Sequence, residues 1–202
     1  GGYWKELLER IRDIRATEKV LYRQVLEIYA TSIDYDPRAS VSQEFFKKVQ
    51  NKIHYAIHGH TAAELIVERA DAEKDFMGLL TFKGNQPTLS EARTAKNYLD
   101  EKELRAMGQL VSGYLDFAER QAEREQPMTM NDWANYLDRI LTMSGEQLLL
   151  DSGKVSHTEA MEHATNEYRK YKQRTISDVE QDYLDSIKRI GNIGKKGDKN
   201  EN

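Results

Sequence analysis

The sequence contains no cysteine and only three prolines in 202 residues. The lack of cysteine excludes disulfide bridges and thiolate metal sites, and it is typical of a reducing compartment. No apolar run approaches the roughly 20 residues needed to cross a bilayer, and no signal-peptide pattern opens the chain. A net charge of −4 gives the surface as a whole no attraction for nucleic acid. These absences predict a cytoplasmic protein with no membrane partner.

Charged residues make up 32% of the chain, and apolar residues recur among them at spacings of three and four. This period predicts an all-α, single-domain helical bundle. We expect a long N-terminal helix or linker over 1–34, a helical domain over 35–190, and a disordered tail over 191–202. The pattern over 3–33 predicts one protruding helix of about 45 Å at 1.5 Å per residue. Its length favours pairing with another helix, and a homodimer through this helix is expected.

Helix starts are indicated by a Ser, Thr or Asp followed three residues later by Glu or Gln, the capping-box pattern. The last helix is expected to run without a break from about residue 156 to about residue 187. The six capping boxes are Ser40 with Gln43, Thr61 with Glu64, Thr88 with Glu91, Asp100 with Glu103, Ser144 with Gln147, and Ser156 with Glu159.

The densest chemistry lies in residues 54–61, which hold three of the five histidines. A helix carrying His54 and His58 ends at Gly59, and a new helix starts just after His60. Amides at a helix start attract anions, phosphate above all, and a nearby imidazole can accept a proton from an attacking hydroxyl. The candidate catalytic residues are therefore His54, His58 and His60, and the candidate phosphate-binding residues are Gly59, Thr61 and Ala62.

Two other interpretations of this segment remain open. His54 and His58 are four residues apart on one helix face, so with His60 and Glu64 they could ligate a metal ion. Alternatively, His54 packs in the core through one hydrogen bond, and His58 stabilises the negative C-terminal end of its helix. Local spacing does not decide among the three.

Five stretches of the chain carry a long and specific pattern: 3–12, 27–37, 49–64, 68–73 and 95–99. Together they resemble the C-terminal domain of the RhuM family of bacterial virulence proteins. The resemblance implies an N-terminal DNA-binding-like domain that is missing here, so that DNA is contacted only through that domain. It also implies a place on prophages and pathogenicity islands, and leaves delivery into a host open.

A looser resemblance links the histidine segment to Fic and Doc proteins, which transfer a nucleotide or phosphate to a protein hydroxyl. His54 would match their motif histidine, Gly59 the loop glycine, and Thr61 with Ala62 the start of the next helix. Ala56, His58 and His60 replace the motif's Phe, acidic residue and Asn, and the basic residues that grip the phosphates are missing. The resemblance implies a Fic-like core, a nucleotide such as ATP with Mg, and a protein target.

Two functions follow from these observations. The first is a toxin- or effector-like domain that binds a phosphate-bearing ligand near the histidines and transfers a nucleotidyl or phosphoryl group. The alternative is a non-catalytic dimerisation or protein-interaction module of a DNA-binding regulator. The sequence leaves open whether the chain is an enzyme.

Overall fold

The structure is a computed structural model, and it describes residues 2–17, 21–175 and 178–197. All regular elements in these ranges are helices, with no strand among them, which confirms the predicted all-α bundle. The elements are α1 (Gly2–Thr17), α2 (Leu21–Tyr29), α3 (Ser40–His58), α4 (Ala62–Arg69), α5 (Leu89–Ala92), α6 (Glu101–Glu123), α7 (Met130–Met143), α8 (His157–Arg174), α9 (Asp178–Gly197), and the 3-10 helices η1 (Asp75–Gly78) and η2 (Ala95–Tyr98).

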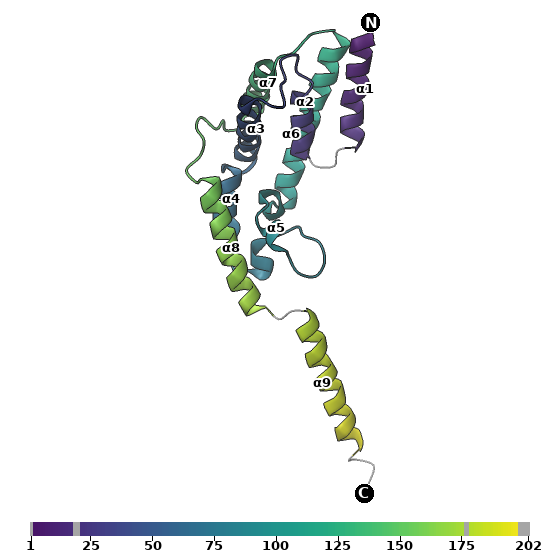
Figure 1. The fold of residues 1–202 in the computed structure, drawn as a ribbon, viewed down its shortest axis with the longest axis vertical. Coiled ribbons are helices and arrows are strands. Elements are labelled where there is room, and N and C mark those ends of the chain that lie inside the picture. The colour runs from purple at the N-terminus through teal and green to yellow at the C-terminus, as the bar shows by residue number, and fades with distance from the viewer. Residues whose placement is uncertain (1, 18–20, 176–177, 198–202) are drawn as a thin grey trace.

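Helix α6 is the centre of the bundle, with α1 and α2 lying along it (Figure 1). Tyr114 of α6 is fully buried and donates its hydroxyl to the carbonyl of Trp133 at 3.0 Å. Tyr29 of α2 meets Phe45 of α3 edge to face, with ring centroids 4.8 Å apart. Large aromatic side chains therefore pack at the centre of the bundle, among the more numerous buried aliphatic residues. Helix α4 packs mainly against α8 and η2, and its buried Leu65 and Ile66 belong to the same hydrophobic core.

The N-terminal segment differs from the prediction of one protruding helix. Helix α1 ends at Thr17 and α2 begins at Leu21, while residues 18–20 lie outside the described part. Both helices bury an apolar stripe against α6, including Ile11 and Ile28. Two short helices have the same local apolar period as one long helix, so periodicity alone did not reveal the break. The face that suggested a homodimer through this helix is occupied within the chain.

Four of the six capping boxes form as predicted, at Thr61, Thr88, Asp100 and Ser156. The box at Ser40 is wrong, because α3 already begins at Ser40 and its N-cap, Ala39, has no side-chain hydrogen bond. The helix predicted after Ser144 is also wrong. Ser144 instead ends α7, and residues 145–156 form an irregular segment.

The C-terminal stretch is two helices rather than the single one predicted. Helix α8 ends at Arg174 and α9 starts at Asp178, while residues 176–177 lie outside the described part. The predicted disordered tail, 191–202, begins inside α9, which continues to Gly197, and residues 198–202 are not described. In Figure 1, α9 lies away from the body formed by the other helices.

Candidate functional site

The predicted helix–glycine–helix turn is present. Gly59 adopts a left-handed conformation with φ of 76°, and its N–H donates to the carbonyl of Tyr55 at 2.8 Å, which ends α3. Two residues later, Thr61 caps α4, accepting from the Glu64 amide at 3.3 Å. The turn therefore places the start of α4 next to the end of α3.

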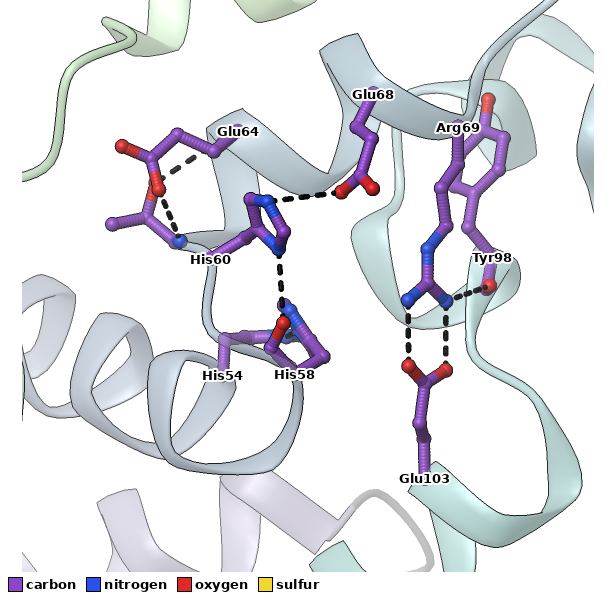
Figure 2. Close-up of polar contacts among 9 residues, drawn as sticks. His54, His58, His60, Glu64, Glu68, Arg69, Tyr98 and Glu103 are labelled. Carbon is purple, nitrogen blue, oxygen red and sulfur yellow. Dashed lines mark hydrogen bonds and ion pairs between the residues drawn. The ribbon is translucent and has the colours of Figure 1, made fainter. Parts of the chain in front are cut away.

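The three imidazoles form a chain of contacts rather than a ring around one point (Figure 2). Nδ1 of His54 lies 3.0 Å from Nε2 of His58. Nδ1 of His60 hydrogen-bonds the carbonyl oxygen of His58 at 2.9 Å, and its Nε2 lies 3.1 Å from the Glu68 carboxylate. The His60 Nε2 is directed toward Glu68, while the ring itself lies nearly parallel to that of His58, with centroids 6.0 Å apart.

Burial lowers the pKa of His54 to about 4 and the pKa of His58 to about 3. The His54 side chain belongs to a residue only 2% exposed, so its charged form would lose most of its hydration. For His58, the neighbouring His54 adds to the desolvation effect. Both rings are therefore neutral at about pH 7.

Three of the amides that open α4, those of Thr61, Ala62 and Glu64, already have partners. The Thr61 amide donates to the Glu64 carboxylate at 2.8 Å, and the Ala62 amide donates to the side-chain oxygen of Asn51 at 3.4 Å. The capping box thus satisfies donors that the sequence left free for a phosphate. Any anion here depends on side chains for most of its hydrogen bonds.

Such side chains surround a cavity of about 650 Å³ between α3, the start of α4, residues 93–96 and the segment leading into α8. We call it the basic cavity. His54, Thr61 and Ala62 line it, whereas Gly59 and His60 line a separate hollow of about 570 Å³ beside residues 148–155. His58 lines neither of these two hollows. The structure thus brings together three of the six predicted site residues.

The lining of the basic cavity carries four cationic side chains, Lys47, Arg93, Lys96 and Lys154, and one carboxylate, that of Glu159. Within the described part of the chain, none of the four cations forms an ion pair. A cleft walled by one sign of charge concentrates ions of the opposite sign, even though the chain as a whole carries −4.

Sequence reasoning missed these cations because they come from three separate segments: α3, residues 93–96 and the segment leading into α8. Lys96 belongs to the 3-10 helix η2, whose position against α4 is set by tertiary packing. One part of the cavity lining could have been predicted from the sequence. The capping box at Ser156 indicates that a helix starts there, and His157, its first residue, lines the cavity.

The residues proposed as metal ligands are directed to different partners. His54 and His58 contact one another, and Glu64 accepts hydrogen bonds from the amides of Thr61 and Lys154. Among the described residues, no group of three or more histidine or carboxylate side chains is placed to hold a metal ion.

Gly153 is where the 145–156 segment meets the cap of α4. It has φ of 83°, and an added Cβ would lie 2.5 Å from Cγ2 of Thr61. We expect Gly153→Ala to lower the free energy of unfolding by about 1–2 kcal/mol more than Gly145→Ala. Gly145 has a similar φ of 75° but open space around it, so Gly145→Ala measures the cost of the backbone strain alone. The difference between the two variants is then the cost of the steric overlap with Thr61. Chemical denaturation measures both, and equal losses would show that the segment moves aside freely.

The described fold is an all-α bundle, and none of its helices is long and apolar enough to cross a membrane. The family model of the virulence protein RhuM family matches residues 1–179, and the chain belongs to this family. No curated protein and no solved structure matches this chain. The family match ends at the first turn of α9, so nearly all of that helix lies beyond it.

Proposed function

We propose that this domain binds a phosphate-bearing ligand in the basic cavity. The observation that carries the proposal is the set of four cations without ion-pair partners around one cavity, with the buried His54 in its wall. Lysine and arginine are the side chains that recognise phosphate, and unpaired cations gain most from such a guest. The volume of about 650 Å³ is in the range of small-molecule sites and suits a nucleotide such as ATP.

His54 acts in this proposal as a hydrogen-bond donor. Nδ1 of His58 is buried and has no partner in the described structure. A buried N–H without an acceptor is costly and rare in proteins, so the favoured tautomer leaves this Nδ1 without a proton. His58 then donates from Nε2 to Nδ1 of His54, and His54 carries its own proton on Nε2. A neutral imidazole N–H is thereby available to a phosphate oxygen.

The same reasoning separates binding from Fic-like group transfer. A general base needs a free ring nitrogen and a pKa near the working pH, whereas His54 offers an N–H and has a pKa lowered to about 4 by burial. Glu159, the carboxylate of the lining, is engaged by the Ser156 amide at 2.7 Å, so Mg would enter with the nucleotide rather than on the protein. We therefore favour recognition of the ligand over nucleotidyl transfer. A toxin- or effector-like role would depend on that recognition.

Calorimetry with pyrophosphate and with MgATP as probes tests the proposal. Removing one phosphate contact costs about 1 kcal/mol, so Lys96→Ala and Lys154→Ala should each weaken binding roughly five-fold. The double variant should lose roughly 25-fold. His54→Phe keeps a buried ring without the N–H and should weaken binding by a similar factor to one lysine.

Lys102→Ala is the matched control, because Lys102 is exposed on α6 and outside the cavity lining. It makes the same change in net charge and should leave both affinities unchanged. The proposal fails if the wild type binds neither probe, or if Lys102→Ala weakens binding as much as the cavity variants. A protein target modified by the wild type but not by His54→Phe would instead favour transfer.

A further inference from the structure

Helix α9 presents an uncovered apolar face. Val179 is 78% exposed, Tyr183 66% and Ile190 69%, and Ile187 and Leu184 are also exposed. Val179, Tyr183, Ile187 and Ile190 recur at spacings of three and four, so they share one side of the helix. A contiguous stripe of this kind is unusual on a monomer and indicates an interaction surface.

Charge is divided sharply along the same helix. Residues 178–185 contain four acidic residues and no basic one, whereas residues 188–197 contain four basic residues and no acidic one. Each half of the helix is therefore complementary to the other half of an identical helix that runs in the opposite direction. Two copies running in the same direction would place like charges side by side.

We propose that α9 pairs with α9 of a second copy of this chain in an antiparallel arrangement. The apolar stripe forms the contact, and the acidic half of each helix lies along the basic half of the other. A helix of this length spans about 30 Å, enough for a short two-stranded coiled coil. The pairing is independent of ligand binding in the basic cavity.

The position of the charges around the helix favours the same arrangement. At 100° per residue, Asp182 and Arg189 lie on the same flank of the apolar stripe, almost two turns apart. In an antiparallel pair related by a two-fold axis, the same flank of each helix meets. Asp182 of each copy then lies within about a helical turn of Arg189 of the other. In a parallel pair, this flank would face the opposite flank instead.

The location of α9 leaves the stripe accessible to a partner. In the described part of the chain, α9 has no extensive contact with any other helix and lies away from the body in Figure 1. It also falls almost wholly beyond residues 1–179, which the family model matches.

Sedimentation of the full chain at a series of concentrations tests the proposal. The wild type should approach twice the chain mass of 23.4 kDa, whereas Ile187→Asp should stay at one chain mass. Leu150→Asp is the control, because Leu150 is 93% exposed outside α9 and its replacement should leave the wild-type mass. Ile187 lies outside the core, so thermal unfolding of the helical body should be unchanged in Ile187→Asp. A wild type that remains a monomer at every concentration overturns the proposal.

Orientation is tested with single cysteines, because the chain has none of its own. Ile187 lies near the middle of α9, so Ile187→Cys should form a disulfide between copies under an added oxidant. In the antiparallel pair, two copies of Val179→Cys would lie roughly 20 Å apart at 1.5 Å per residue and should not cross-link. Cross-linking of both variants would indicate a parallel pair and overturn the proposed arrangement.

A charge swap distinguishes self-pairing from binding to some other apolar surface. Asp182→Arg and Arg189→Asp should each weaken the dimer a few-fold, because each places like charges across the pair. The double variant, D182R with R189D, exchanges the charges within the helix and should restore the wild-type dimer. Failure of the double variant to recover would show that the two residues do not meet across two copies.

Discussion

Acidification from about pH 7 to about pH 4 is expected to cost the folded state roughly 3 kcal/mol through His54 alone. Burial lowers the pKa of His54 from the reference value of 6.5 to about 4, so the unfolded chain takes up this proton first. Stability from the neutral ring is therefore fully present above pH 6.5 and is lost as the pH falls toward 4. His58 shifts in the same direction and adds to the loss.

The measurement is urea unfolding of the wild type and His54→Gln across this pH range. His54→Gln should be less stable at neutral pH, because it disturbs a buried contact with His58. Its stability should then fall less steeply between about pH 6.5 and pH 4, since one buried imidazole no longer titrates. Above about pH 7.5 the two curves should run parallel. Equal slopes at acid pH would show that His54 is hydrated in the folded state.

The carboxylates act in a lower window, so the two effects can be separated. The pKa of Glu103 is lowered chiefly by its hydrogen bonds with Arg69, and that of Glu64 by the amides of Lys154 and Thr61, against the opposing effect of burial. Their contributions are present above the ordinary glutamate pKa of about 4.3 and disappear only below it. A loss that starts near pH 6.5 therefore belongs to histidine.

The parts of the fold that could be predicted from sequence are those with local causes. The capping box at Thr61 formed because both partners lie within one turn of chain, and the left-handed bend at Gly59 needs only the glycine itself. The prediction of one continuous helix over 3–33 was wrong because the apolar period is the same on both sides of the break. The packing of both α1 and α2 against α6 is a tertiary interaction that the local pattern does not encode.

The candidate site was predictable only in part for the same reason. Residues 54–61 were visible as a unit because they are contiguous, and His54, Thr61 and Ala62 do share one cavity. The cations opposite them, such as Lys96 and Lys154, come from distant segments that no spacing rule joins. The basic cavity and the hollow at His60 are separate because residues 145–156 pass between them, over the turn at 59–61. This segment is irregular, so no sequence pattern predicts its path.

Arg69→Ala is expected to lower the free energy of unfolding by about 3 kcal/mol. The guanidinium donates to both oxygens of Glu103 at 2.7 and 2.6 Å, and to the carbonyl of Tyr98 at 2.9 Å (Figure 2). It thereby joins α4, η2 and α6 at one point. Truncation leaves a half-buried carboxylate whose remaining donor is the Asp100 amide at 2.8 Å, and it removes the donor to the Tyr98 carbonyl. The loss of the charged partner of a half-buried carboxylate costs more than the pair itself contributes.

Arg105→Ala is the matched control, because Arg105 pairs with Glu101 at 3.2 Å on the exposed face of α6. That pair should contribute no more than about 0.5 kcal/mol. A double variant, Arg69→Met with Glu103→Leu, removes the unpaired charge but also the acceptor of the Asp100 amide in the α6 capping box, so it should recover only part of the loss. Thermal or urea unfolding measures all three, and an Arg69→Ala loss no larger than that of Arg105→Ala would show that Glu103 stays hydrated.

The same ion pair connects the stability of the fold to the basic cavity. Arg69 ends α4, whose first residues line the cavity, and Tyr98 closes η2, which carries Lys96. Fixing α4 to η2 therefore sets the spacing between two walls of the cavity. Arg69→Ala should weaken pyrophosphate binding although Arg69 does not line the cavity. Gly145→Ala, which strains the backbone outside the cavity and should also be less stable than the wild type, should bind pyrophosphate as the wild type does. Binding unchanged in Arg69→Ala would mean that the packing of α4 on α8 alone maintains that spacing.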